Sequence, residues 1–256
     1  MMAKTILDFQ IIDNKQISKD FFILELLSGL TLPEIYPGQF VQVRIDGSPG
    51  TFLRRPFSVH DLNPATNSIK LLIQVAGAGT KALSFKRKGD ILNIILPLGN
   101  SFSLPPKNTK TLLVGGGCGV APLLFLAKYL KSNSCQFEVL MGFRSRDRII
   151  EFEEYSNLGR VYLTTEDGSE GEKGYVTHHS VLSDKKFDRI YCCGPESMMK
   201  AVAEYSHMHK IHCEVSLENL MACGIGACLC CVVDTIDGNV CTCTDGPVFN
   251  INNLKW

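Results

Sequence analysis

The sequence has almost no net charge, since its 256 residues carry 26 Lys plus Arg against 26 Asp plus Glu. This balance removes the electrostatic case for nucleic acid, or for an anionic membrane surface, as the main partner. Long apolar runs are also missing, because the longest, from Val120 to Ala127, is too short to span a bilayer. The first eight residues place polar side chains where a signal peptide needs apolar ones, so we predict a cytoplasmic protein.

Acid–base catalytic groupings are lacking as well. The pair Glu166-Asp167 precedes Gly168 and is typical of a solvated turn. The pair His178-His179 fits surface or core polar positions, and no spacing points to a Ser/His/Asp arrangement. We therefore predict that this chain holds no catalytic acid or base of its own.

Cysteine, by contrast, is abundant, with 11 residues. An odd number in a chain without a secretory signal favours a reducing compartment and metal chemistry over a disulfide framework. Four of them repeat the C-x4-C-x2-C…C spacing that holds a [2Fe–2S] cluster. These predicted ligands are Cys223, Cys228, Cys231 and Cys243. Gly224 and Gly226 give the loop the backbone freedom that three converging thiolates need.

Two alternatives to this ligand set stay open. A structural zinc site or a reactive disulfide is one, although zinc sites usually pair their ligands as two C-x2-C hooks and this segment has a single one. The choice of fourth ligand is the other, because Cys241 competes with Cys243. We favour Cys243, which directly precedes a Thr-Asp-Gly-Pro turn that can fold it back over the cluster. Using Cys230 instead would destroy the spacing.

The rest of the chain shows two different patterns of secondary-structure signals. Short β-branched and aromatic segments separated by turn residues predict an all-β barrel domain over residues 1–104. Strand, glycine turn, helix and strand then alternate over residues 105–210, which predicts a parallel α/β nucleotide-binding domain. Residues 211–256, rich in glycine and cysteine, form the predicted cluster module.

Three further motifs could bind phosphate groups. The glycine turn Gly115 to Gly119 follows a strand and opens a helix, where backbone N–H groups and the helix dipole can bind a pyrophosphate. It departs from the G-x-G-x-x-G fingerprint, so a plain tight turn between strand and helix is an equal alternative. The segments Arg55 to Ser58 and Leu72 to Thr80 could hold a phosphate and a ring edge, but each is also a common strand exit.

Taken in order, these motifs resemble those of the ferredoxin-NADP reductase superfamily. They are Pro37-Gly38-Gln39-Phe40, Arg55-Pro56-Phe57-Ser58, Gly77-Ala78-Gly79-Thr80, the turn from Gly115 to Pro122, and Cys193-Gly194-Pro195. The cysteine-rich end, from Glu218 to Phe249, narrows the resemblance to the electron-transfer subunits of type B dihydroorotate dehydrogenases. The match covers nearly the whole chain. One departure is Leu96, where relatives often have the smaller glycine before Pro97-Leu98-Gly99.

The resemblance implies three cofactors and the residues that bind them. FAD would be held by Arg55, Pro56, Phe57, Ser58, Leu72, Ile73, Gln74, Gly79 and Thr80. NAD would lie along Gly115, Gly116, Gly117 and Gly119, with Cys193, Gly194 and Pro195 near the nicotinamide. The [2Fe–2S] cluster would take the four cysteines named above. The choice of NAD over NADP rests on the resemblance alone.

The same resemblance implies the function. A partner subunit would oxidise dihydroorotate on FMN in pyrimidine biosynthesis, and electrons would pass through the [2Fe–2S] cluster and FAD of this chain to NAD⁺. The implied assembly is a heterotetramer of two copies of each subunit, with the cluster module facing the partner. Related subunits of a sulfide dehydrogenase or of a ferredoxin-dependent transhydrogenase are the alternative enzymes. A non-catalytic redox sensor is the alternative outside enzymes.

Overall fold

The computed structural model describes residues 4–48 and 50–256, which form two compact units. The first unit runs to Ser101 and also takes Asn219–Val233 and Asn239–Pro247. The second unit consists of Phe102–Glu218, Asp234–Gly238 and Val248–Trp256. The cysteine-rich end is therefore shared between both units, and the division into three domains stays a prediction.

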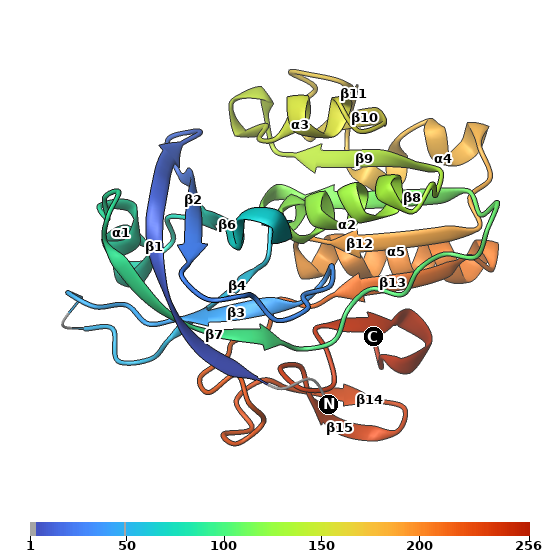
Figure 1. Cartoon of the computed structure of the whole chain (residues 1–256). Coiled ribbons are helices and arrows are strands. Elements are labelled where there is room, and N and C mark those ends of the chain that lie inside the picture. The colour runs from blue at the N-terminus through green and yellow to red at the C-terminus, as the bar shows by residue number, and fades with distance from the viewer. Residues whose placement is uncertain (1–3, 49) are drawn as a thin grey trace. The chain divides into compact units, whose positions relative to one another are not determined.

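An antiparallel sheet builds the first unit, with strand order β4-β3-β7-β1-β2-β6-β5 (Figure 1). The strands are β1 Thr5–Gln16, β2 Phe21–Ser28, β3 Phe40–Val43, β4 Arg55–Ser58, β5 Asp61–Asn63, β6 Ser68–Gln74 and β7 Ile91–Leu98. Along β2 the side chains of Phe22, Leu24 and Leu26 are fully buried and their neighbours less so, because successive strand residues point to opposite faces. This curved half-barrel confirms the all-β N-terminal domain. One short helix, α1 Ala78–Ser84, follows β6.

A mainly parallel sheet builds the second unit, with strand order β11-β10-β9-β8-β12-β13-β16. The strands are β8 Thr111–Gly116, β9 Phe137–Phe143, β10 Arg160–Thr165, β11 Glu172–Lys173, β12 Arg189–Cys193, β13 His212–Ser216 and β16 Val248–Asn250. Every residue of the central strand β8 is buried, as expected of a strand covered on both faces. This sheet confirms the predicted α/β domain.

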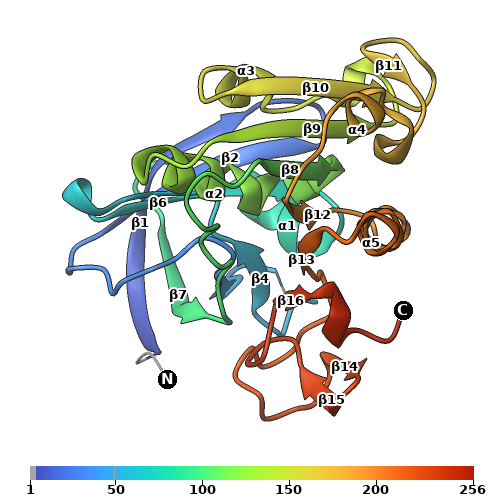
Figure 2. The same cartoon turned by 90° about the vertical axis from the view of Figure 1, so that its right-hand side faces the viewer.

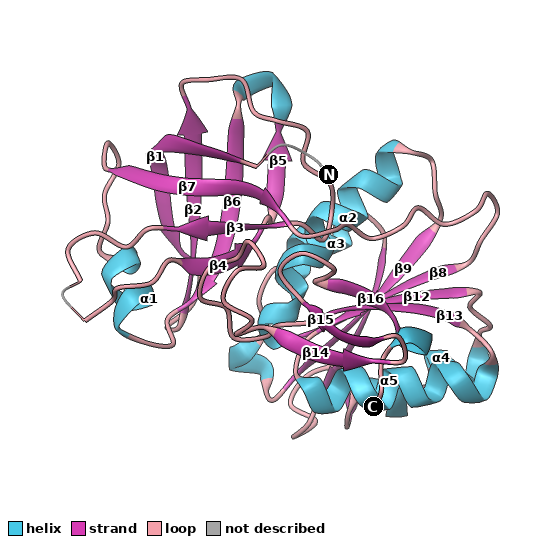
Figure 3. Ribbon diagram, turned by 90° about the horizontal axis from the view of Figure 1, so that it is seen from below, coloured by secondary structure: helices cyan, strands magenta, loops and turns pink. Residues whose placement is uncertain are grey.

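Helices cover both faces of the parallel sheet. They are α2 Val120–Ser132, α3 Phe152–Ser156, α4 Val181–Asp184 and α5 Glu196–His209. Figure 3 shows α2 and α3 on one face and α4 and α5 on the other. Helix α2 buries nine of its thirteen residues, so its apolar run belongs to the core of the unit. Within residues 4–48 and 50–256, no helix is long and apolar enough to cross a membrane.

The cysteine-rich segment has little regular structure of its own. Residues 219–231 form loops, and a hairpin of β14 Val232–Thr235 and β15 Gly238–Cys241 follows (Figure 2). The chain then returns as β16, which pairs antiparallel with β13 at the edge of the parallel sheet. The last segment is thus anchored to the sheet by main-chain hydrogen bonds.

Candidate cofactor sites

The predicted FAD residues come from three places in the half-barrel. Arg55 to Ser58 form the edge strand β4, Leu72 to Gln74 end β6, and Gly79 with Thr80 begin α1. The fold brings two of these together, because a Cβ atom on Gly79 would lie 3.5 Å from Nε of Arg55 and 3.2 Å from Cγ2 of Thr51. Gly79 therefore lies directly beside the Arg55 guanidinium, with no side chain of its own between them. A cation next to a small-residue turn suits a phosphate group.

Two adjacent arginines have different tasks in this region. Arg54 donates through Nη1 to the carbonyl oxygens of Gln42 at 3.3 Å and Asn93 at 2.8 Å, so it ties β3 to β7. Burial lowers the pKa of Arg54 from its usual value, with the charge of Arg44 adding to the effect. Arg55 donates through Nη1 to the carbonyl oxygen of Leu53 at 2.8 Å, within its own loop. Arg54 is thus structural, and sequence alone offered no signal to separate it from Arg55.

Thr80 is already engaged in local hydrogen bonds. Its hydroxyl oxygen accepts from the backbone N–H groups of Ala76 at 2.9 Å and Gly77 at 3.1 Å. It also lies 3.1 Å from the carbonyl oxygen of Gly77, to which it donates. Thr80 therefore shapes the turn that precedes α1, and a direct contact between Thr80 and a phosphate stays a prediction.

The glycine turn of the second unit packs tightly against the end of β12. A Cβ atom on Gly119 would lie 2.2 Å from the carbonyl oxygen of Cys193 and 2.4 Å from the nitrogen of Gly194. A Cβ atom on Gly116 would lie 2.4 Å from Sδ of Met198, in α5. The structure therefore brings together the glycine turn and Cys193-Gly194-Pro195, which the sequence only places on separate strands. Close packing of this kind is compatible both with a plain tight turn and with a nucleotide-binding site.

Cys193 itself is almost fully buried at the end of β12. Burial raises the pKa of its thiol well above the usual value, and the nearby Glu218 carboxylate adds to this effect. The thiol is therefore protonated at neutral pH, and it donates to Oε1 of Glu218 across 3.8 Å. A neutral thiol at this place can pack against a ligand but is a poor nucleophile.

Backbone N–H groups point at sulfur atoms throughout the cysteine-rich loops. Ile225 N–H donates to Sγ of Cys223 at 3.4 Å, and Gly226 N–H donates to Sγ of Cys243 at 3.2 Å. Cys243 N–H donates in turn to Sγ of Cys231 at 3.4 Å. Donors arranged in this way stabilise sulfur atoms that carry negative charge. The loops thus fit an anionic, thiolate-bound cluster.

Two glycines make this loop geometry possible. Gly224 has φ +70° and Gly226 has φ +84°, which favour glycine. A Cβ atom would lie 2.7 Å from Cγ of Gln42 at position 224 and 2.9 Å from Cγ2 of Thr244 at position 226. Both positions therefore exclude a side chain by backbone conformation and by space.

The thiol of Cys223 ionises more easily than a free cysteine. Burial opposes ionisation, but hydrogen bonds from the backbone of Ile225, Cys228 and Ala227, together with the Cys228 side chain, outweigh it and lower the pKa of Cys223 to about 6. Cys228 is exposed, whereas Cys231 and Cys243 are buried. Among the described residues, no three His, Cys, Asp or Glu side chains are grouped closely enough to hold a single metal ion.

Cys231, Cys241 and Cys243 form one buried cluster with Phe40 of β3 and Leu98 of β7. Cys241 and Cys243 therefore both remain near the site, and they differ in their hydrogen bonds. Sγ of Cys243 accepts from Gly226, while the backbone N–H of Cys241 donates to Oδ2 of Asp245 at 3.0 Å. This difference favours Cys243 as the fourth ligand.

We predict that Cys241→Ser and Cys243→Ser proteins differ sharply. The Cys241→Ser protein should keep its iron and acid-labile sulfide, because the sulfur that receives the Gly226 amide is still present. The Cys243→Ser protein should lose most of both. Iron and sulfide assays on the two purified variants test this, and equal loss in both would assign Cys241 a ligand role.

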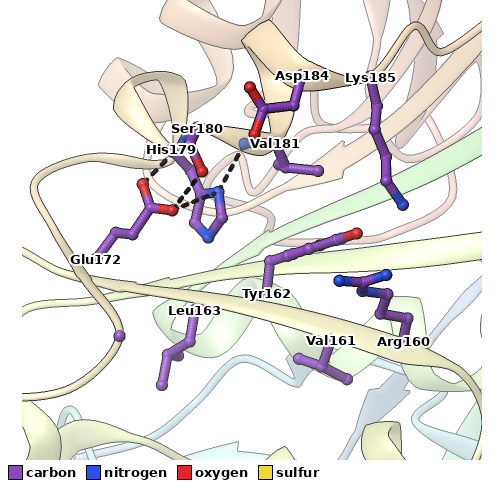
Figure 4. A pocket seen from close by; sticks show the side chains of 11 residues that line it. Arg160, Val161, Tyr162, Leu163, Glu172, His179, Ser180, Val181, Asp184 and Lys185 are labelled. Atoms are coloured by element: carbon purple, nitrogen blue, oxygen red, sulfur yellow. Dashed lines mark hydrogen bonds and ion pairs between the residues drawn. The ribbon is translucent and has the colours of Figure 1, made fainter.

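One cavity in the second unit has no residue of the glycine turn in its lining. Its volume is about 420 Å³, and Arg160 and Tyr162 of β10 line it together with His179 and Lys185 (Figure 4). Nδ1 of His179 accepts from Val181 N–H at 3.0 Å, and burial lowers the pKa of His179. Glu138 accepts from Lys185 at 2.6 Å and from Tyr162 at 2.8 Å. These polar side chains find their hydrogen-bond and charge partners within the protein, so we assign them a structural role.

Two family models match this chain. Residues 218–255 match the iron-sulfur cluster binding domain of dihydroorotate dehydrogenase B. Residues 113–204 match the oxidoreductase NAD-binding domain. The first model begins just before the cysteine loops, and the second spans the glycine turn and Cys193. For the turn at Gly115 to Gly119, the match favours a nucleotide site over a plain connection.

Curated relatives cover nearly the whole chain. The chain is 36% identical over 251 residues to the dihydroorotate dehydrogenase B (NAD(+)) electron transfer subunit of Shouchella clausii, covering 95% of this chain and 96% of the relative. It is 39% identical over 246 residues to the subunit of the same name from Caldanaerobacter subterraneus subsp. tengcongensis, covering 94% of each.

A solved structure matches as well. A chain of the NADH-dependent reduced ferredoxin-NADP oxidoreductase, a structure described in the context of flavin-based electron bifurcation, aligns with a TM-score of 0.87. The identity is 32%, and the alignment covers 100% of this chain and 92% of the other. Both units and the cysteine-rich end therefore have counterparts in one known chain.

Proposed function

This chain belongs to the family of dihydroorotate dehydrogenase B electron-transfer subunits, and from this membership we propose its function. The chain takes up electrons from the oxidation of dihydroorotate in an FMN-containing catalytic subunit and delivers them to NAD⁺ in pyrimidine biosynthesis. When bound, the [2Fe–2S] cluster supplies single-electron exchange, and FAD links this exchange to the two-electron hydride chemistry of NAD. The observation that carries the proposal is the amide-lined cysteine loop inside the matched iron–sulfur domain.

Cys223, Cys228, Cys231 and Cys243 are the proposed cluster ligands. The support is the set of backbone N–H groups that point at Cys223, Cys231 and Cys243. Hydrogen bonds to sulfur hold the loop in its ligating shape and set the electron affinity of the bound cluster. The exposed position of Cys228 places the loop within reach of another protein.

FAD and NAD are assigned to the two units separately. In the first unit the proposed FAD residues are Arg55, Pro56, Phe57, Ser58, Leu72, Ile73, Gln74, Gly79 and Thr80. The support is the close approach of Gly79 to the Arg55 guanidinium. In the second unit the proposed NAD residues are Gly115, Gly116, Gly117, Gly119, Cys193, Gly194 and Pro195. The support is their tight packing within the matched NAD-binding domain.

The catalytic subunit is proposed to dock on the cysteine-rich loops. Three apolar side chains are exposed there: Leu220 at 85%, Ile225 at 48% and Leu229 at 65%. Apolar groups concentrated in one exposed loop region mark interaction sites, and docking beside the cluster shortens the path of the electron. The proposed complex is a heterotetramer, with two copies of this chain and two of the catalytic subunit. Eleven cysteines, seven of them outside the proposed ligand set and none in a disulfide among the described residues, support a reducing cytoplasm as its compartment.

The docking proposal predicts that Leu229→Lys weakens the complex. A charge on a desolvated apolar contact should cost about tenfold or more in affinity for the catalytic subunit. Leu30→Lys is the matched control, because Leu30 is also 65% exposed but lies outside the cysteine-rich segment. Binding of both variants to the purified catalytic subunit is measured by titration. Equal affinities of the two variants would rule out this docking surface.

One second function is favoured by a specific observation. The 32% identity to the NADH-dependent reduced ferredoxin-NADP oxidoreductase chain supports a role as the subunit of a transhydrogenase of that type. The discriminating experiment is co-purification from the native cells. An FMN protein that oxidises dihydroorotate is expected as the partner, whereas a ferredoxin-dependent NADP-reducing partner would favour the second function. A non-catalytic sensor predicts no rapid bleaching of the flavin by NADH.

A further inference from the structure

One buried amide beside the cysteine loops has no hydrogen-bond partner in the part of the chain that the structure describes. Both Nε2 and Oε1 of Gln42 are unpaired, and the residue is fully buried. A buried polar group without a partner lowers the stability of the fold. A bound ligand at this place would supply the missing hydrogen-bond partner and so explain why the amide is buried.

Gln42 lies directly against the loop that carries Cys223. A Cβ atom on Gly224 would lie 2.7 Å from Cγ of Gln42 and 2.9 Å from Nε2. The Gln42 side chain thus packs against the backbone of the residue that follows Cys223. Any side chain at position 224 would clash with the side chain of Gln42.

The strand places Gln42 on the face that packs against the other cysteines. Phe40, two residues earlier in β3, belongs to the buried cluster of Cys231, Cys241 and Cys243. The register between β3 and β7 shifts between Phe40 and Gln42, but their regular pairing with Ser58 and Pro56 in β4 keeps both residues on one face of β3. Ile95, which is the register partner of Gln42 in β7, packs against the same cluster. Gln42 therefore faces the cysteine site with its neighbours.

The strand neighbours offer the amide nothing to bind. Its register partners are Ile95 in β7 and Pro56 in β4, and neither side chain carries a polar atom. Gly224 has no side chain at all. The buried cysteines that share this face of the strand, and the cluster that they would hold, are the candidate acceptors for Nε2.

We propose that the Gln42 amide donates a hydrogen bond to a sulfur of the bound [2Fe–2S] cluster and thereby raises its midpoint potential. Gln42 is a positioning residue in this role, since the cysteines make the bonds to iron. Hydrogen bonds to sulfur stabilise the reduced, more negative state of a cluster. The inference rests on the proposed function for the presence of the cluster.

The test compares reduced-cluster EPR spectra and redox titrations of the complete chain with those of Gln42→Met and Gln42→Glu. Met removes both amide atoms, while Glu keeps the shape and removes the amide donor. In each variant we expect a shifted EPR signal and a lower midpoint potential. The expected shift corresponds to about a tenfold change in the ratio of oxidised to reduced cluster at fixed potential, or about 59 mV for one electron.

Gln39→Met is the matched control. Gln39 is also buried, but its Nε2 donates to the Gly99 carbonyl oxygen at 3.0 Å and its Oε1 accepts from Tyr36 N–H at 2.8 Å. This variant should unfold at a lower temperature with the cluster potential unchanged. Gln42→Met should shift the potential without a comparable loss of thermal stability.

Three outcomes would overturn the inference. They are an unchanged cluster potential and EPR signal in both Gln42 variants, a shift of the flavin potential in place of the cluster potential, and a shift in Gln39→Met equal to that in Gln42→Met. A wild-type chain that contains no iron and sulfide would contradict the proposed function instead. The failure of the two proposals is thus distinguishable.

Discussion

Cys228→Ser should abolish dihydroorotate-driven reduction of NAD⁺ while NADH still reduces the flavin. Serine is a poor ligand for iron, so the cluster should be lost together with the electron path from the catalytic subunit. Loss of a group that merely supports a metal ligand costs about 10–100-fold, so loss of a ligand should lower the rate at least about 100-fold. Iron, sulfide and flavin assays accompany the kinetic measurement.

Cys230→Ser is the matched control for this variant. Cys230 is an exposed cysteine of the same loop, but it does not fit the ligand spacing. The control should keep its cluster and its activity. If Cys228→Ser lost its flavin together with its iron, the separation of the flavin and cluster sites would be wrong.

Gly119→Ala should weaken the binding of NADH and leave FAD and the cluster in place. The new Cβ atom would lie 2.2 Å from the carbonyl oxygen of Cys193, a distance at which the backbone must move. Overpacking of this kind costs about 1–3 kcal/mol, so the KM for NADH should rise by about tenfold or more. The measurement is the anaerobic rate of flavin reduction over a range of NADH concentrations.

Gly29→Ala controls for the glycine substitution itself. A Cβ atom on Gly29 would meet no atom within 4 Å, and its backbone conformation suits alanine. This variant should bind NADH like the wild-type chain. An unchanged KM in Gly119→Ala would show that the glycine turn is a structural connection and that NADH binds elsewhere.

The layers of the fold were predictable because local patterns determine them. Alternating burial along β2 and continuous burial along β8 follow directly from the order of apolar residues. The cysteine spacing pointed to the loops where backbone amides and sulfur atoms meet. Each of these signals is contained within a few neighbouring residues.

The details of the sites were not predictable, since they depend on contacts between distant segments. Nothing in the order of residues separates Arg54, which ties two strands together, from Arg55, which lies beside Gly79. In the sequence Gln42 looks like an ordinary strand residue, and only the structure shows that Gly224 packs against it. The return of the chain as β16 beside β13 is likewise a pairing that no local pattern specifies.

The central claim is that this chain carries electrons between a [2Fe–2S] cluster, a flavin and NAD. The most direct test is an anaerobic absorption spectrum of the purified chain, recorded before and after addition of NADH and accompanied by iron and flavin assays. We expect flavin bands and a broad iron–sulfur absorption that bleach together on addition of NADH. A protein that contains zinc and no flavin would contradict both the cofactor assignment and the proposed function.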